Sequence, residues 1–363
     1  MQIKSLELAD FRNYEYLSVR FDESINIIYG ANAQGKTNIL ESIYMCSSGK
    51  SHKGSKEKEI IKEGKTESHI KAQFEGIYGK ERVDIHLKAG KGKGIALNRM
   101  PVKKISDLYG KIKVVIFSAE DLDIIKRSPS DRRRFLDMEI CQIDSFYVED
   151  LINYNRLRKQ RNELFKLLEE DENKKEGLID TLDIIDFQFA KIGKRIIERR
   201  KKFIEEINGI ISDIHLDISS GKEKLKLIYE PSCGEEEFYE ELIRNRKKDI
   251  ITKTTNSGPH RDDFSFSAQG KDMKIYGSNG QQRSCALSLK LSEIRIIEKE
   301  KKEKPVLLLD DVLSELDRSR QRKLLERLGQ TQTIITCTGV DEFIGNELKE
   351  AKKFYVEDGR VMA

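Results

Sequence analysis

Two short motifs near opposite ends of this 363-residue chain constrain its fold more than any other feature. The first, GANAQGKT at 30–37, follows an apolar segment rich in β-branched residues and precedes an amphipathic segment that begins at Asn38. The second, VLLLDD at 306–311, is an apolar run that ends in two carboxylates. A strand, loop and helix, followed much later by an apolar strand, predict one α/β sheet built from both ends of the chain.

The first motif fits the pattern G-x-x-x-x-G-K-[ST], which predicts a phosphate-binding loop. Glycines permit a tight turn with backbone N–H groups facing phosphate oxygens, and the following helix adds its positive N-terminus. We expect Lys36 to neutralise the β- and γ-phosphates of ATP and the Thr37 hydroxyl to bind Mg²⁺. A chance match is the alternative, and the flanking strand and helix argue against it. The expected ATP-binding residues are Gly30, Ala31, Asn32, Ala33, Gln34, Gly35, Lys36, Thr37 and Asn38.

Asp310 and Asp311 admit two interpretations. An apolar strand can simply leave the core through an acidic turn. Beside a phosphate loop, the motif indicates instead that Asp310 binds Mg²⁺, directly or through water. Asp311 would then orient or activate the water that attacks ATP. The expected catalytic residues are therefore Lys36, Asp310 and Asp311, and the expected metal ligands are Thr37 and Asp310.

Composition excludes several classes of protein. The net charge is only +4 although 36% of the residues are charged, which indicates interspersed surface charge rather than a uniformly basic chain. The five cysteines have no C-x-x-C spacing, so they imply neither a zinc site nor a disulfide framework, and His52 and His69 are not spaced as metal ligands. No apolar run approaches the length of a membrane span. We expect a cytoplasmic protein with reduced thiols.

The pattern of polar and apolar residues, and with it the predicted secondary structure, changes along the chain. Residues 68–98 alternate between polar and apolar, which predicts an antiparallel sheet with one solvated face. From Arg132 to about Leu216 the sequence predicts long helices that would form an antiparallel arm. The expected domains are a split head, residues 1–130 and 255–363, and an inserted, mainly helical arm, residues 131–254.

A third motif, SNGQ at 278–281, begins a predicted helix ahead of the Asp-Asp strand. Its serine hydroxyl, its glycine N–H and the helix N-terminus together suit a second anion site, although Ser278 could also serve only as an N-cap. The motif resembles the signature of ABC-type ATPases, which implies that Ser278, Gly280 and Gln281 complete the ATP site of a partner copy. Ser314 and Asp317 resemble the D-loop of the same proteins.

Several segments together resemble the RecF family of DNA replication and repair proteins. They are FRNY at 11–14, AQGKTN at 33–38, SHK at 51–53, EDL at 120–122, SPSDRRRFLD at 128–137, GPHRDD at 258–263 and LLDDVLSELD at 308–317. The resemblance covers most of the chain. It implies an α/β fold: an ABC-type P-loop NTPase head, with a mixed sheet and an antiparallel β subdomain, that carries an inserted α-helical arm.

The resemblance also implies a function in recombinational repair and replication restart. An ATP-driven homodimer would bind single-strand gaps and single–double-strand DNA junctions and would help to load a recombinase with RecO and RecR. Its DNA-stimulated ATPase would be weak and would act as a switch, with ATP and Mg²⁺ as cofactors. It would act in the cytoplasm, at the nucleoid, without a membrane partner.

Three positions depart from the ABC pattern. The glutamine expected after the apolar segment at 113–117 is absent, and Glu120 stands nearby. Thr338 stands where a histidine is expected, and Asp311 stands where transporters usually carry glutamate. Because an aspartate side chain is shorter by about 1.5 Å, we expect the attacking water to be less well aligned and hydrolysis to be slow.

Arg199, Arg200, Lys201 and Lys202 lie in the most basic stretch of the predicted arm. Phosphate contacts dominate non-specific DNA binding, so these residues are the candidates for it, with a solvated helix face as the alternative. No aromatic residues interleave with these charges, so sequence-specific readout is not expected. Arg12 and His260 could each contact a phosphate or have a purely structural role.

Two other functions explain parts of the sequence. An ABC-type head could drive or regulate a protein partner without DNA, but it would not need a basic arm and would normally carry the missing glutamine and histidine. A phosphotransferase would use the phosphate loop, but it would have no use for the motif at Ser278. ATP-dependent dimerisation and DNA retention distinguish these functions.

Overall fold

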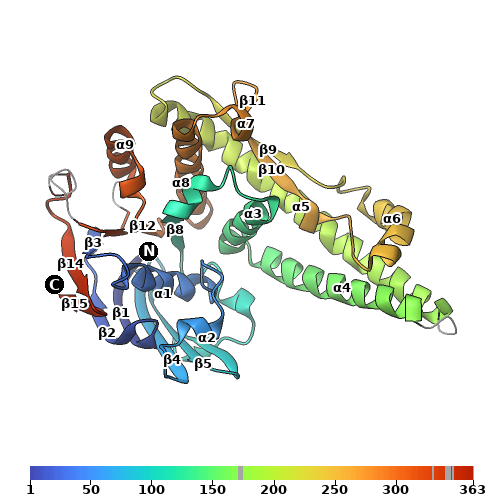
Figure 1. The fold of residues 1–363 in the computed structure, drawn as a ribbon, viewed down its shortest axis with the longest axis horizontal. Helices are drawn as coiled ribbons and strands as arrows, with labels where there is room; N and C mark the ends of the chain where they lie inside the picture. The colour runs from blue at the N-terminus through green and yellow to red at the C-terminus, as the bar shows by residue number, and fades with distance from the viewer. Residues whose placement is uncertain (171–174, 329–330, 340–344, 346, 363) are drawn as a thin grey trace. The chain divides into compact units, whose positions relative to one another are not determined.

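The computed structural model describes residues 1–170, 175–328, 331–339, 345 and 347–362 (Figure 1). The chain divides into two compact units: residues 1–123 with 286–363, and residues 124–285. The sequence predicts that 255–285 belongs to the head, whereas the structure places this segment in the second unit. The difference arises because the strand at 263–268 pairs with the strand at 225–230. Within the described ranges, no helix is both long and apolar enough to cross a bilayer.

The first unit contains a six-stranded mixed sheet in the order β15-β14-β3-β13-β12-β8. All its strand pairs are parallel except β14 with β15. Every residue of β12 and β13 is buried, as expected for central strands covered on both faces. The strands are β3 (Ile25–Tyr29), β8 (Val114–Ser118), β12 (Val306–Asp310), β13 (Thr333–Cys337), β14 (Lys352–Glu357) and β15 (Arg360–Met362).

A second six-stranded sheet of this unit is antiparallel and has the order β2-β1-β4-β5-β6-β7. Burial alternates along β4, which confirms the one-sided sheet expected from the polar–apolar pattern. The strands are β1 (Gln2–Phe11), β2 (Tyr14–Arg20), β4 (Glu67–Gly76), β5 (Gly79–Lys88), β6 (Gly92–Leu97) and β7 (Met100–Pro101). Two short helical segments lie in the connections between the two sheets: α2 (Glu57–Ile60) and η1 (Ile105–Asp107). A third, η2 (Ala119–Asp123), follows β8.

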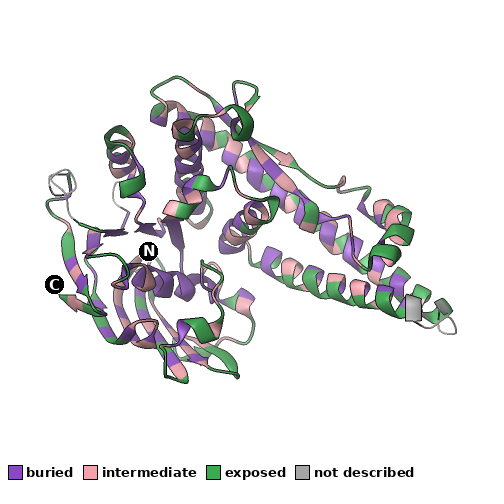
Figure 2. Ribbon diagram, viewed as in Figure 1, coloured by how far each residue is buried: buried purple, intermediate pink, exposed green. Residues whose placement is uncertain are grey.

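Helix α1 (Lys36–Ser48) lies between the two sheets of the first unit. It contacts β8, β12 and β13 of the mixed sheet and β4 and β5 of the antiparallel sheet. Nearly all of the helix is therefore buried, as Figure 2 shows. The carboxylate of Glu41 is buried as well. The connection from β12 to β13 contains η5 (Leu313–Glu315) and α9 (Arg318–Leu328).

The second unit is built on long helices (Figure 1). Ser128 caps the first of them with the help of Asp131 and of Pro129 in the first turn. Its helices and 3₁₀ segment are α3 (Pro129–Ile143), α4 (Ser145–Glu170), α5 (Lys175–Ile218), α6 (Phe238–Thr252), η4 (Pro259–Arg261) and α7 (Met273–Tyr276). Its strands are β9 (Leu225–Glu230), β10 (Asp263–Ala268) and β11 (Lys271–Asp272). Helix α8 (Asn279–Lys301) starts in this unit.

Helices α4 and α5 are antiparallel neighbours (Figure 1). Asp150 near the start of α4 pairs with Arg195, and Arg161 further along α4 pairs with Asp186 further back in α5. Arg161 is fully buried, and its guanidinium donates to Asp186 at 2.5 Å and to Asp249 of α6 at 2.6 Å. One buried cation thus joins three helices of the second unit.

Candidate nucleotide-binding site

The loop between β3 and α1 has a shape that requires glycine at both ends. A Cβ on Gly30 would lie 2.2 Å from the backbone oxygen of Val356. Gly35 has a φ of 107°, and a Cβ there would lie 2.4 Å from the side-chain amide of Asn13. Gly35 caps α1 without a side-chain hydrogen bond, so no cap side chain occupies the N–H groups of the first turn. A helix N-terminus of this kind suits a phosphate group.

Lys36 points its ammonium back into the loop. The Nζ atom donates to the carbonyl oxygens of Gly30 and Ala31, at 2.9 Å each, and the residue is only 4% exposed. An ammonium has three donors, so one remains for a phosphate oxygen. Ala31, Asn32 and Ala33 are exposed at the tip of the loop.

The two motifs of the sequence meet at Asp310. Thr37 Oγ1 donates to Asp310 Oδ1 at 2.7 Å, and Thr336 Oγ1 donates to the same oxygen at 2.8 Å. The contact follows from the sheet, because Asp310 and Thr336 are paired at the carboxyl ends of parallel β12 and β13. Thr336 is not among the residues predicted from the sequence, because its contact with Asp310 depends on the register of β12 and β13.

Asp311 is held in an unusual conformation directly after β12. Its φ is 54°, and its backbone N–H donates to Thr336 Oγ1 at 3.0 Å. Its Oδ1 is buried without a hydrogen-bond partner among the described residues. Burial, together with the neighbouring charge of Asp310, raises the pKa of Asp311. A carboxylate with a raised pKa and an unsatisfied oxygen is suited to take a proton from water.

The oxygens at this edge of the sheet fit a magnesium ion. Mg²⁺ prefers oxygen ligands in octahedral geometry and usually keeps several waters beside one or two protein ligands and substrate phosphates. Thr37 and Asp310 supply a hydroxyl and a carboxylate that already lie within hydrogen-bond distance. These two residues would hold the ion, and the ion would neutralise charge on the β- and γ-phosphates.

A second set of residues fixes the loop from outside. Asn13 Nδ2 donates to Gln34 O at 2.8 Å, and Asn38 Nδ2 donates to Asn13 Oδ1 at 2.8 Å. The backbone N–H of Asp358 donates to Gln34 Oε1 at 2.6 Å. The side chains of Gln34 and Asn38, expected at the nucleotide, are thus engaged in holding the loop. Asn13 belongs to the FRNY segment at 11–14, but the sequence predicts neither Asn13 nor Asp358 as a support of the loop, because the loop's own residues do not show which distant residues contact it.

Arg12, for which the sequence allows either a phosphate contact or a structural role, has the structural role. Its Nε and Nη2 donate to the two carboxylate oxygens of Glu41, at 2.9 and 2.7 Å. Nη2 also donates to Ser55 Oγ at 2.6 Å. Glu41 is fully buried in α1, so this ion pair fixes the helix that begins with the phosphate loop.

The predicted D-loop residues lie in exposed positions after β12. Ser314 Oγ donates to the backbone oxygen of Asp311 at 2.7 Å. Asp317 accepts the N–H of Arg320 at 3.0 Å and so caps α9. Glu120 and Thr338 follow β8 and β13, the two strands that flank β12, and both are exposed.

The motif at Ser278 forms a reciprocal cap on α8 in the second unit. Ser278 Oγ accepts the N–H of Gln281 at 3.3 Å, and the Gln281 side chain accepts the N–H of Ser278 at 2.8 Å. Gln281 also donates to Glu223 at 2.6 Å. Ser278 is exposed and Gly280 is partly exposed, so the capped helix end presents its hydroxyl to solvent. The N-cap role and an anion-binding role are compatible at this position.

The four candidate DNA-binding residues do not form one surface. Arg200 is 2% exposed and donates to Asp137 at 2.8 Å and Asp262 at 3.0 Å, so its assignment to DNA is corrected to a structural role. The acidic residues that hold it come from α3 and from the turn before β10, which the basic run in the sequence does not reveal. Lys201 and Lys202 are exposed.

Arg199 is partly buried and pairs with Asp144 at 3.0 Å. His260 is also structural, because its Nε2 faces the backbone oxygen of Thr255 at 2.9 Å and its Nδ1 faces the hydroxyl of Tyr154 at 2.7 Å. A carbonyl only accepts, so Nε2 carries the proton and Nδ1 accepts from the tyrosine. Burial lowers the pKa of His260 to about 4.

Comparisons with known proteins agree with this geometry. The family model for the RecF/RecN/SMC N-terminal domain matches residues 2–358. A DNA replication and repair protein RecF from Lachnospira eligens is 53% identical over 362 residues, which cover 100% of this chain and 99% of the relative. The Smc head domain from Pyrococcus furiosus, solved with the C-terminal domain of ScpA, is 19% identical with a TM-score of 0.55 over 99% of this chain and 95% of that one, and supports the fold alone.

A solved structure described as the recombination mediator protein RecF with ATP, in the RecFOR pathway, superposes with a TM-score of 0.91 at 36% identity. The match covers 99% of this chain and 97% of that one. The fold is therefore the α/β P-loop NTPase head of the ABC type. The full-length identity to curated relatives and this superposition show that the chain belongs to the RecF family.

Proposed function

We propose that this protein is an ATP-dependent DNA-binding switch that acts in DNA repair and replication. One observation carries the proposal: Lys36, Thr37 and Asp310, from motifs at opposite ends of the chain, converge at a helix N-terminus shaped for phosphate. A solved relative with the same fold is described as a complex with ATP. Here Lys36 would bind the phosphates, while Thr37 and Asp310 would hold Mg²⁺.

A second copy of the chain would complete the site. Ser278 presents an exposed hydroxyl at the N-terminus of α8, and Gly280 and Gln281 shape that helix end. A hydroxyl and helix N–H groups are ligands for a γ-phosphate. ATP held by Lys36 of one copy would thus join two copies in a symmetric dimer, in which each site is shared.

DNA is the proposed macromolecular partner, since the relatives of this chain are DNA replication and repair proteins. Exposed cations of the second unit are the proposed contacts: Arg156, Lys191, Lys201 and Lys202. No described residue forms an ion pair with Arg156 or Lys191, so both remain available to phosphates. RecO and RecR are proposed partners by analogy with the relative placed in the RecFOR pathway. The proposed location is the cytoplasm, at the nucleoid.

The proposal is tested by DNA affinity for duplex, single-stranded and gapped substrates, each with ATP and with ADP. We expect tight binding only with ATP, strongest at gaps. Charge reversal of Arg156, Lys191, Lys201 and Lys202 to glutamate should weaken DNA binding at least about tenfold at low salt while ATP binding persists. The matched control reverses four exposed lysines of the first unit: Lys58, Lys80, Lys91 and Lys103.

Three outcomes count against parts of this proposal. ATP-driven dimers without DNA affinity would favour a head that acts on a protein partner. Equal loss of DNA binding in the control would show that overall charge, rather than the surface of the second unit, determines the affinity. Monomers under all conditions, with ATP turnover intact, would remove the shared site.

Asp311→Asn is expected to lower ATP turnover by about 10²–10⁴-fold and to leave ATP binding and dimerisation in place. Turnover falls because the amide cannot take a proton from water. ATP binding persists because the amide has the size of the carboxylate and leaves the contacts of Lys36 with the loop carbonyls unchanged. Single-turnover hydrolysis and gel filtration with ATP measure the two effects. Asp311→Glu provides the comparison: faster turnover supports limited reach of the aspartate, and unchanged or slower turnover excludes it.

A further inference from the structure

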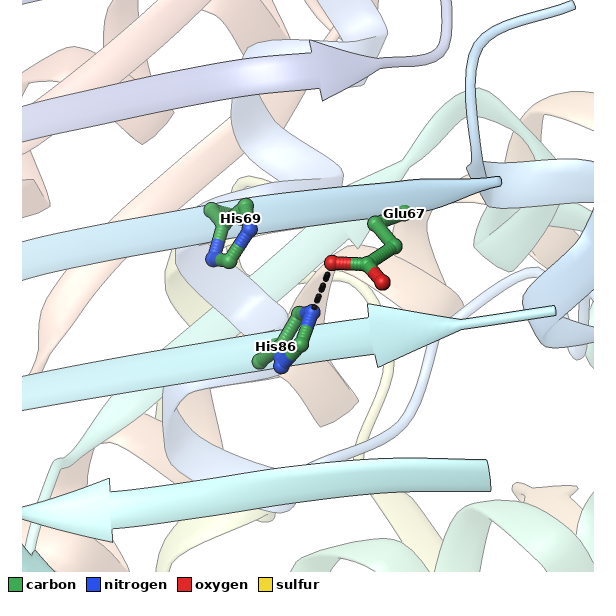
Figure 3. Close-up of side chains that lie close together, drawn as sticks. All are labelled: Glu67, His69 and His86. Atoms are coloured by element: carbon green, nitrogen blue, oxygen red, sulfur yellow. Dashed lines mark hydrogen bonds and ion pairs between the residues drawn. The ribbon is translucent and has the colours of Figure 1, made fainter. Parts of the chain in front are cut away.

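Three polar side chains meet on the antiparallel sheet of the first unit, away from the phosphate loop. His69 of β4 lies directly opposite His86 of β5, and their rings stack with centroids 4.3 Å apart and an interplanar angle of 8°. Glu67 is two positions before His69, so it projects from the same face of the sheet. Figure 3 shows its carboxylate directed toward the rings, with Oε2 at 2.9 Å from His86 Nε2.

We propose that Glu67, His69 and His86 bind one divalent transition-metal ion, with Zn²⁺ as the first candidate. Each residue offers one ligand atom, and the three atoms lie within 4.8 Å of one another. Zinc bonds of about 2.0–2.2 Å in tetrahedral geometry place ligand atoms about 3.4 Å apart. Side-chain rotations that move the ligand atoms by roughly an ångström would therefore bring all three within bonding distance of one ion.

The donor set selects the class of metal. Two imidazole nitrogens and one carboxylate oxygen are typical of zinc sites with an open position, and also bind nickel, cobalt and copper. Magnesium and calcium prefer oxygen ligands alone, so two imidazoles disfavour both ions at this site. The two metal sites on the first unit are thus chemically distinct.

The carboxylate is already oriented for this role. Lys88, opposite Glu67 in the strand register, forms an ion pair with Oε1 of Glu67, while Oε2 faces the imidazole. A neighbour that fixes one oxygen leaves the other to bind the ion, as outer partners do in many metal sites. The same contacts describe a surface charge cluster, and metal affinity is the property that separates the two interpretations.

The fourth position of the ion would be open to solvent or to a small ligand. His69 is exposed, and the side chains of His86 and Glu67 are 43% and 36% exposed. The histidines line a hollow of about 460 Å³ in the sheet surface, whose other walls include Tyr16, Lys71, Asp84 and Pro101. A bound ion would cross-link β4 and β5, and its fourth ligand would be an exchangeable water that faces this hollow.

The test uses the untagged full-length protein, titrated with Zn²⁺ against a chromophoric chelator in a large excess of Mg²⁺. We expect one ion per chain and at least about tenfold weaker binding in His69→Ala and in His86→Ala. Co²⁺ should give the absorption bands of a tetrahedral site in the unaltered protein only. Zinc should also raise the melting temperature of that protein and not of the histidine variants.

The controls separate this site from chance binding. Cys233 is the partly exposed thiol among the five cysteines, and Cys233→Ser should bind zinc like the unaltered protein. His69→Gln, which keeps a polar side chain of similar size, should lose zinc affinity while the circular dichroism spectrum stays the same. Absence of stoichiometric zinc binding overturns the proposal, and so does equal affinity in either histidine variant or loss of binding in Cys233→Ser.

Discussion

Lys36→Ala protein is expected to lose ATP binding and, with it, ATP-driven dimerisation. The ammonium of Lys36 is buried and lies 2.9 Å from the carbonyl oxygens of Gly30 and Ala31, where it would offset the charge of bound phosphates. Its loss removes that charge and leaves two carbonyls without their donor. We expect turnover to fall by at least about 10²-fold, the scale on which single positioned donors act.

Equilibrium binding of a fluorescent ATP analogue measures the first effect, and gel filtration with ATP measures the second. Lys50→Ala is the matched control, because Lys50 is exposed just beyond the other end of α1. It should bind ATP like the unaltered protein. If the two variants had the same ATP affinity, the loop between β3 and α1 would not be the nucleotide site.

Arg161→Met is expected to reduce the stability of the second unit by about 3–5 kcal/mol, the usual cost of removing one partner from a buried ion pair. Asp186 and Asp249 are both fully buried against Arg161, so the substitution takes this cation from Asp249 and leaves Asp186 with Arg246. The cation also lies 4.7 Å from the ring centre of Phe165, and this contact is lost as well.

Urea unfolding followed by circular dichroism measures this loss, because the second unit carries the long helices α4 and α5. Arg195→Met is the control: Arg195 joins the same two helices through Asp150, but its side chain is 45% exposed. Exposed pairs contribute about 0–1 kcal/mol. Equal effects at the two positions would show that the buried cluster does not hold the three helices together.

The loop between β3 and α1 can be predicted from the sequence, because its residues stand in short, fixed spacings. A glycine loop between a strand and a helix has one geometry, so Lys36 and Thr37 follow from the motif alone. The strand that ends at Asp310 follows from its apolar run. Thr336 could not be predicted in the same way, because it reaches Asp310 only through the register of β12 and β13.

Longer-range packing explains the remaining differences. Arg200 appeared to belong to a basic surface, yet Asp137 and Asp262, distant in sequence, bury it. The boundary near residue 285 depends on the pairing of β9 with β10, which spans a whole helix. His69 and His86 have no metal-like spacing, and only the hairpin of β4 and β5 brings them face to face.

The central claim is that a triphosphate bound at Lys36 of one copy is completed by Ser278 of another. Mixing two inactive variants, Lys36→Ala and Ser278→Arg, tests it directly by ATP turnover. A mixed dimer contains one site with both residues intact, so an equal mixture should recover roughly one quarter of the unaltered activity while each variant alone stays inactive. A mixture as inactive as its parts, or full turnover by Ser278→Arg alone, would contradict the shared site.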